Sequence, residues 1–400
     1  MTASRPPNGA ESPVFDTDAL LDDPGTRIVV CCGSGGVGKT TSAAALGLRA
    51  AERGRDVVVI TVDPARRLAQ SMGLHTLDNT PRPVDLPGAD AGTGRPAGTL
   101  YAMMLDMKRT FDEIVEAHAD PERARQILAN PFYQSLSSSF SGTQEYMAME
   151  KLGQLRQSGD WDLIIVDTPP SRSALDFLDA PKRLGRFLDG RLLKILSAPA
   201  KTGAFRLIGA GFGVVTGIIS KIVGAQLLRD VQTFVTAFDA VFGDFQERAE
   251  QTYRLLQAPD TAFIVVAAPD PDALREASYF IERLGADRMP LAGVVVNRTH
   301  RTATQGLSME QSLAAAEAVA ESGDHALAAA ALRLHAERAR MEAREIRLRE
   351  RLTAAHPGVP VVEIPARPED VSDLGGLHEI GEAMGNGGFQ SRTGGNGVSG

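Results

Sequence analysis

Seven short apolar runs recur along this chain of 400 residues, and helical segments separate them. The runs cover residues 28–32, 57–62, 100–105, 163–166, 263–267, 293–296 and 361–364. Most of them are continuously apolar, which is typical of strands that are buried on both faces of a sheet. Strand and helix repeated in this order predict an α/β fold with a doubly wound, mostly parallel sheet.

Two of the connecting segments are too long to be simple crossovers. Residues 108–157 and 175–258, with approximate bounds, look helical, and we expect them to be helical insertions that form a subdomain. A third helical segment, residues 312–355, is rich in Ala, Arg, Glu and Leu. We interpret it as one amphipathic packing helix, or as two joined near residues 322–324. A coiled-coil partner helix is the less favoured alternative, because no strict heptad persists.

Composition and charge narrow the class of protein. The chain has 42 Lys plus Arg and 50 Asp plus Glu, a net charge of −8, which argues against a nucleic-acid partner. Residues 1–25 read as a flexible arm without an apolar signal segment, and residues 385–400 as a disordered tail. The folded domain would then span residues 26–384. We expect a cytoplasmic protein, or as an alternative one that is peripheral to the membrane through a partner. We expect no transmembrane span, because the most apolar stretch, residues 207–220, is shorter than the about 20 residues that a span needs.

A glycine-rich motif follows the first apolar run. Residues 33–40 read Gly-Ser-Gly-Gly-Val-Gly-Lys-Thr and fit the pattern G-x-x-x-x-G-K-[ST], with a helical segment directly after them. Its glycines allow backbone N–H groups to point inward at phosphate oxygens, and the helix start adds its positive dipole end. The residues expected to bind phosphate are Gly35, Gly36, Val37, Gly38, Lys39, Thr40 and Thr41. Lys39 would reach the β- and γ-phosphates and Thr40 would ligate Mg²⁺. A glycine-rich turn without a ligand is the alternative that this context disfavours.

Two aspartates follow apolar runs of the predicted sheet. Asp63 comes directly after the second run and Asp167 directly after the fourth. In open α/β sheets, ligands bind at the carboxyl ends of the strands. Asp63 could orient or deprotonate an attacking water, and Asp167 could hold Mg²⁺ directly or through water. Each could instead be only a helix cap, but the nearby phosphate loop favours a functional role.

These motifs together resemble those of the deviant Walker A ATPases, and more narrowly the arsenite-pump and tail-anchored-protein-targeting ATPase family. The resemblance rests on the loop at 33–40, on Asp63-Pro64-Ala65, on Asp167-Thr168-Pro169-Pro170 and on Val295-Val296-Asn297. It implies ATP and Mg²⁺ as ligands, catalytic roles for Asp63 and Lys39, and metal support from Thr40 and Asp167. It also implies that Asn297 reads the adenine edge, aided by the loop with Pro365 and Arg367. Members of the family close as dimers over two ATP molecules and reopen after hydrolysis.

The chain departs from the family pattern at Ser34. The family's loop reads G-K-G-G-x-G-K-[ST], and its extra lysine reaches the ATP of the partner subunit, which a serine hydroxyl cannot do. We therefore favour a heterodimer with a paralogous ATPase subunit that keeps this lysine. In this respect the chain resembles the Ser-bearing member of the paired ATPases of actinobacteria. Slow activity, or compensation by Arg66 or Arg67, is the alternative.

The family's zinc-binding and arsenite-binding cysteines are missing, because the only cysteines are Cys31 and Cys32 in the first run. Residues 207–228 are the most hydrophobic part of the chain and read either as a buried helix or as a groove for a hydrophobic protein cargo. The favoured function is an ATPase that couples Mg-ATP hydrolysis to binding and release of a protein or anion cargo. The alternatives are a slow regulatory ATP-binding subunit and, more weakly, a partitioning-type positioning ATPase. The acidic balance and the lack of a basic amphipathic C-terminal helix disfavour the last.

Overall fold

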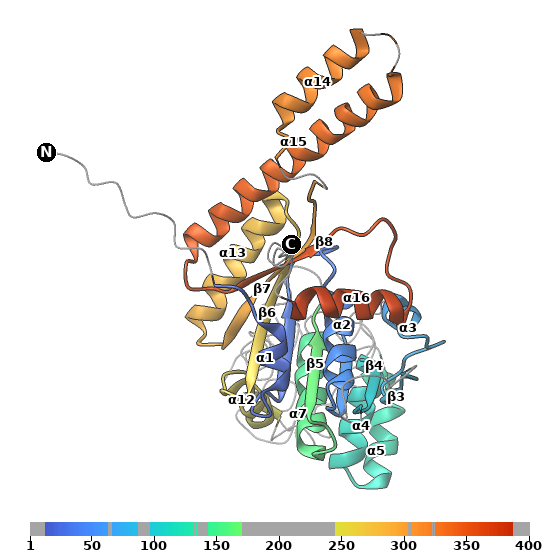
Figure 1. Ribbon diagram of the computed structural model, residues 1–400. Coiled ribbons are helices and arrows are strands. Elements are labelled where there is room, and N and C mark those ends of the chain that lie inside the picture. The colour runs from blue at the N-terminus through green and yellow to red at the C-terminus, as the bar shows by residue number, and fades with distance from the viewer. Residues whose placement is uncertain are drawn as a thin grey trace, which may run out of the picture.

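The computed structural model describes residues 13–62, 66–86, 97–131, 133–134, 143–169, 245–302, 306–321, 323 and 325–386. They form one eight-stranded sheet with the strand order β3-β4-β2-β5-β1-β6-β7-β8 (Figure 1). The strands are β1 Ile28–Cys32, β2 Val57–Thr61, β3 Arg82–Pro83, β4 Leu100–Met104, β5 Leu163–Asp167, β6 Thr261–Ala267, β7 Leu291–Thr299 and β8 Val361–Pro365. Neighbouring strands pair in parallel except β3 and β4. The predicted mostly parallel sheet is confirmed.

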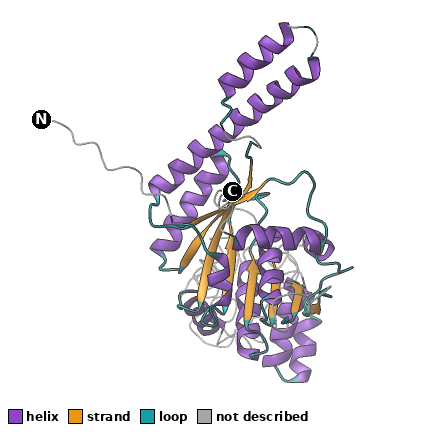
Figure 2. Ribbon diagram, viewed as in Figure 1, coloured by secondary structure: helices purple, strands orange, loops and turns teal. Residues whose placement is uncertain are grey.

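Alternate residues of the strands enter two separate cores. In β1, Val29 and Cys31 belong to one core, whereas Val30 and Cys32 belong to the other. The first core lies under α1 Thr17–Asp22, α2 Lys39–Glu52, α3 Arg66–Ser71 and α16 Leu374–Gly385. The second lies under α4 Met107–His118, α5 Pro121–Leu128, α7 Thr143–Ser158, α12 Phe245–Leu256 and α13 Pro271–Ala286 (Figure 2). Because helices cover both faces, the strands are apolar at nearly every position.

Residues 13–25, which we expected to belong to a flexible arm, are instead packed on the domain. Phe15 is only 4% exposed, and its ring lies against Gly293 of β7. The guanidinium of Arg49 in α2 donates two hydrogen bonds to Asp18 of α1, at 2.5 and 2.6 Å. The folded unit therefore begins before residue 26.

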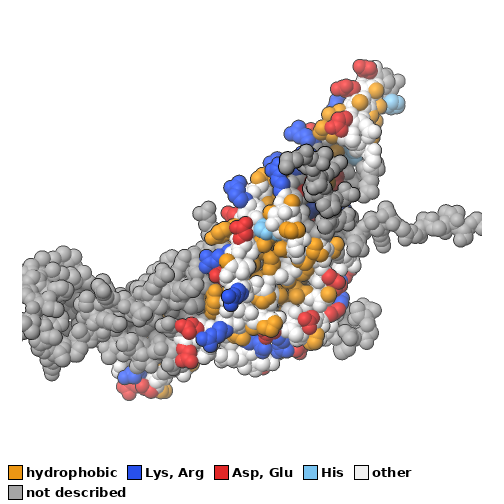
Figure 3. Space-filling view, turned by 90° about the vertical axis from the view of Figure 1, so that its left-hand side faces the viewer, with side chains coloured by type: hydrophobic (Ala, Val, Ile, Leu, Met, Phe, Trp, Pro, Cys, Tyr) orange, Lys and Arg blue, Asp and Glu red, His pale blue; other side chains and the backbone are white. Residues whose placement is uncertain are grey.

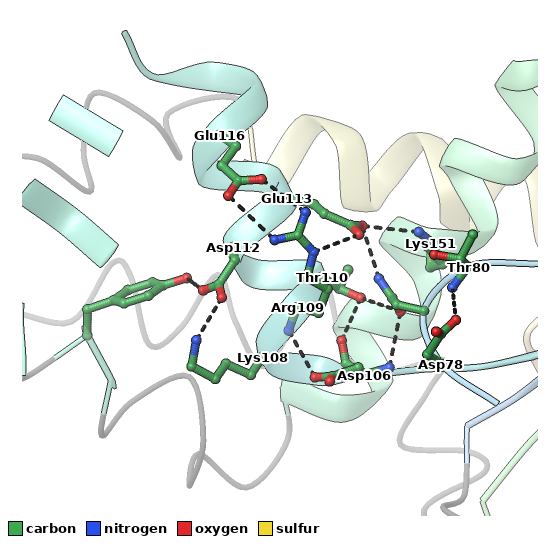
Figure 4. A network of polar contacts seen from close by, with 12 residues as sticks. Asp78, Thr80, Asp106, Lys108, Arg109, Thr110, Asp112, Glu113, Glu116 and Lys151 are labelled. Carbon is green, nitrogen blue, oxygen red and sulfur yellow. Dashed lines mark hydrogen bonds and ion pairs between the residues drawn. The ribbon is translucent and has the colours of Figure 1, made fainter. Parts of the chain in front are cut away.

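The described part of the segment between β4 and β5 forms α4, α5 and α7, which agrees with the helices predicted for residues 108–157. A network of hydrogen bonds and ion pairs links α4 and α7 to the segment before β3, at the edge of the sheet (Figure 4). Lys151 of α7 donates to Glu113 of α4 at 3.1 Å, and Asn79, from the segment before β3, donates to the same carboxylate oxygen at 3.0 Å. Residues 170–244, most of the second predicted insertion including its apolar stretch, lie outside the described residues. In the part that is described, α12 is helical as expected.

The helical segment near the carboxyl end forms two helices, α14 Met309–Glu321 and α15 Ala326–Ala355, which confirms the two-helix alternative. They pack on each other as a hairpin that projects from the sheet, and α15 also packs on α13 (Figure 1). Glu345 of α15 accepts hydrogen bonds from the backbone N–H and the ring Nδ1 of His300, both at 2.7 Å. The base of the hairpin is thus tied to the residue that follows β7. No described helix is long and apolar enough to cross a bilayer.

Candidate nucleotide site

The glycine-rich loop joins β1 to α2 and depends on its glycines. Gly33, Gly36 and Gly38 have φ angles of 150°, 77° and 95°, which side chains rarely adopt. A Cβ on Gly33 would lie 2.0 Å from the carbonyl oxygen of Val266, and one on Gly38 would lie 2.2 Å from Nδ2 of Asn297. At Gly36, by contrast, a Cβ would meet nothing within 4 Å. The loop is therefore pressed against the sheet on one side and open on the other.

Lys39 and Thr40 are the first residues of α2, so the helix begins within the motif and not directly after it as predicted. Lys39 is 6% exposed, and its Nζ donates to the carbonyl oxygen of Ser34 at 2.8 Å, so the ammonium group lies over the loop. Thr40 Oγ1 donates to Oδ2 of Asp167 at 2.7 Å, and Thr61 Oγ1 donates to the same oxygen at 2.9 Å. Because β5 lies between β1 and β2, three elements meet at this one buried carboxylate.

The donor set at this point fits Mg²⁺. Hydroxyl and carboxylate oxygens are ligands that Mg²⁺ accepts, and it usually keeps only one or two protein ligands besides water and phosphate. Thr40 and Asp167 supply one oxygen of each kind. Among the described residues, no cluster of three or more acidic, His or Cys side chains forms a complete metal cage elsewhere. The residues present therefore suit a metal that is shared with a bound phosphate.

A cavity of about 390 Å³ adjoins the loop and is large enough for a nucleoside. Its wall combines Thr40 and Thr41 of α2, Asn297 of β7, and Pro365 and Arg367 at and after the end of β8. The structure thus brings the residues predicted for the phosphates and for the base to one place. Asp63 and Pro64 lie outside the described residues, as do the side chains of Arg66 and Arg67.

Asn297 does more than the sequence predicted. It is 7% exposed; its Nδ2 donates to the carbonyl oxygen of Val37 at 2.9 Å, and its Oδ1 accepts from the N–H of Arg298 at 2.9 Å. The side chain therefore ties the phosphate loop to β7. An amide has two N–H donors and two acceptor lone pairs, so one of each is left for a ligand.

The sequence analysis did not identify two residues that lie at this site, Arg298 and Thr61. Arg298 adopts a φ of 62°, at the point where the pairing of β7 with β8 shifts register, and its Nη1 donates to the carbonyl oxygen of Gly36 at 3.2 Å. Bulges near sites redirect side chains, and an arginine in this conformation is uncommon. No motif marks Arg298. Thr61 did carry a signal, because it is a polar residue in an otherwise apolar run.

The two cysteines belong to the core. Cys31 and Cys32 are 0% and 3% exposed. Burial raises the pKa of the Cys31 thiol well above its ordinary value and raises that of Cys32 to about 12. Both are therefore protonated at neutral pH and unsuited to metal binding or redox exchange.

The amino-acid sequence is similar to those of known ATPases. A model of the family described as anion-transporting ATPase matches residues 26–308. The ATPase GET3 of Podospora anserina is 25% identical over 284 residues, which cover 70% of this chain and 75% of that protein. The ATPase ASNA1 homolog of Cryptosporidium parvum is 26% identical over 267 residues, 66% of this chain and 63% of that protein. The ATPase ARSA1 of Chlamydomonas reinhardtii is 25% identical over 328 residues, 74% of this chain and 38% of that protein. Because the family match spans well over half of the sequence, this chain belongs to the anion-transporting ATPase family.

Proposed function

We propose that this chain is a cytoplasmic ATPase that couples Mg-ATP hydrolysis to the binding and release of a protein or anion cargo. The observation that carries the proposal is the convergence of Thr40 and Thr61 on the Asp167 carboxylate, beside a loop and a cavity that suit phosphates and a nucleoside. The family assignment supports the same reaction.

Each element of the site has a role in this proposal. The N–H groups of the loop from Gly35 to Gly38 hold the phosphates, and Lys39 turns from Ser34 toward them. Thr40 and Asp167 hold Mg²⁺, which neutralises charge on the phosphates when it is bound. Thr61 fixes the Asp167 carboxylate by its hydrogen bond. Asp63 orients or deprotonates the attacking water.

We infer the partner subunit from the serine at position 34, where the family pattern has a lysine. Its Oγ is buried and makes no hydrogen bond within the described structure, and a hydroxyl brings no charge to a neighbouring ATP. A paralogous subunit with lysine at this position would supply that charge in a heterodimer, as in the paired ATPases that the sequence resembles. The alternative is a regulatory subunit that binds ATP and hydrolyses it slowly. Arg298, which already reaches the loop, is a candidate for compensation within the chain.

Turnover of ATP by the purified chain tests the site. Lys39→Ala should lower turnover by at least about 10²-fold, because the loop loses its buried cation. Lys108→Ala removes an exposed lysine that pairs with Asp112 on α4 and is the matched control. Unchanged turnover in Lys39→Ala would show that the site is wrong.

Native mass spectrometry of the protein from its own cells in Mg-ATP tests the partner. A one-to-one complex with a lysine-bearing relative is the expected result, and a homodimer or monomer would refute the heterodimer. Ser34→Lys should raise turnover of the isolated chain if the missing charge limits it. No gain, with the fold intact, would favour the regulatory subunit.

A further inference from the structure

The outer face of α15 carries a row of arginines. Arg333, Arg340, Arg344, Arg347 and Arg351 follow one another at intervals of seven, four, three and four residues, so they share one side of the helix. All five are exposed. At 1.5 Å per residue the row is about 27 Å long. We call it the arginine face; one acidic residue, Glu337, lies within it.

The arginine face has no ion-pair partner in the part of the chain that the structure describes. None of its five side chains takes part in an ion pair or a hydrogen bond there, whereas Arg349 of the same helix pairs with Glu363 of β8. Like charges three or four residues apart destabilise a helix. Apart from Glu337, which is within one turn of Arg333 and Arg340, no acidic residue on this face balances the row.

An apolar ridge runs beside the first part of the arginine face, over residues 333–341, and continues toward the start of α15. Leu327, Leu334 and Met341 recur at seven-residue intervals and are 86%, 53% and 46% exposed. They belong to the first half of α15. Figure 1 shows the hairpin of α14 and α15 projecting from the sheet. Figure 3 shows basic side chains along one edge of the hairpin, hydrophobic ones beside them and acidic ones near its tip. The structure thus shows in α15 a basic amphipathic helix that we did not recognise in the sequence. A helix with an exposed apolar ridge and a basic flank is typical of peptides that lie in the membrane interface.

We propose that the arginine face docks on a membrane surface rich in anionic phospholipids, with the apolar ridge entering the headgroup region. Guanidinium groups bind phosphate oxygens in a bidentate fashion and suit lipid headgroups. Nucleic acid shares this charge, but residues 306–356 contain no Phe, Tyr or Trp on which the bases of a single strand could stack, and the phosphate backbone of a duplex offers nothing for the apolar ridge to enter. The net charge of −8 does not prevent docking, because charges beyond about 10 Å are largely screened at 0.1 M salt.

Flotation of the full-length protein with phosphatidylcholine vesicles, with or without about 30% phosphatidylserine, tests the proposal. We expect binding only to the vesicles that contain phosphatidylserine. Each arginine at such a surface contributes a factor of about five, so Arg340→Gln, Arg344→Gln and Arg347→Gln together should weaken binding by about 10²-fold. The control removes the same charge elsewhere, by Arg123→Gln, Arg254→Gln and Arg275→Gln at exposed positions on α5, α12 and α13. It should bind like the wild type.

The ridge is tested by Leu334→Gln with Met341→Gln, which leaves the charge unchanged and should also weaken binding. Thermal unfolding and ATP turnover of each variant show that the fold and the distant nucleotide site are intact, so failure here is separable from failure of the proposed function. Absence of binding to phosphatidylserine vesicles would overturn the proposal, as would equal binding by the arginine variant. So would binding to duplex DNA or RNA in place of vesicles, or loss of the same size in the control.

Discussion

The substitution Asn297→Ala should separate recognition of the base from support of the phosphate loop. The amide of Asn297 donates one N–H to the carbonyl oxygen of Val37, and its Oδ1 accepts the N–H of Arg298. One N–H and one lone pair of the amide remain for a ligand. Asn297 lines the cavity in which we propose that the base binds. Adenine offers a neighbouring donor and acceptor on its N6 and N7 edge, whereas guanine offers two acceptors there. The spare pair of Asn297 therefore matches adenine and mismatches guanine.

The magnitude follows from these contacts. A bidentate contact discriminates between bases by about 1–3 kcal/mol, so Asn297→Ala should lower the preference for ATP over GTP by about 5- to 150-fold. The same change leaves the buried carbonyl of Val37 without its donor, which should lower the free energy of unfolding by about 1–3 kcal/mol. The affinities for ATP and GTP should both fall, because the loop loses its tether to β7.

Calorimetric titration with non-hydrolysable analogues of ATP and GTP gives the ratio of affinities, and urea unfolding gives the stability. Asn130→Ala is the matched control, because Asn130 is also a buried asparagine, 8% exposed, and accepts the N–H of Tyr133 away from the cavity. It should lower stability without changing the ATP-to-GTP ratio. An unchanged ratio in Asn297→Ala would refute base recognition by this residue, whatever the loss of stability.

Three further predictions concern the phosphate loop, the two cysteine thiols and the stability of the fold at acid pH. Gly33→Ala should abolish ATP binding in a titration, because its Cβ would lie 2.0 Å from a backbone oxygen; retained affinity would show that the loop can move aside. Cys31 and Cys32 should resist a thiol reagent at pH 8 in the native protein and react after unfolding, because their raised pKa values keep them protonated; fast labelling of either would contradict their burial. Arg49 lowers the pKa of the Glu382 carboxyl, so this contact stabilises the fold at pH values above the usual carboxyl range and is lost as the pH falls through the lowered pKa. Urea unfolding between about pH 5 and 3 should therefore show a smaller decline in Arg49→Met than in the wild type, and equal declines would count against the contact.

The sequence predicted the seven longer strands to within about three residues at each end, because burial on both faces makes such strands continuously apolar. It missed β3, which is only two residues long and pairs antiparallel. It also misread residues 13–25, whose polar composition hides that Phe15 is buried and that Asp18 pairs with Arg49.

At the site, the motif around Lys39 and Thr40 could be read directly, because such a loop needs glycines and a lysine at fixed spacing along the chain. The meeting of Thr40, Thr61 and Asp167 could not be read, since it depends on β5 entering the sheet between β1 and β2. The same holds for Arg298, whose reach to Gly36 follows from a register shift between β7 and β8. Local spacing along the chain thus determined what kind of ligand the protein can bind. Only strand order and register decided which distant side chains meet beside that loop, because contacts between elements depend on their position in the sheet and not on their separation in sequence.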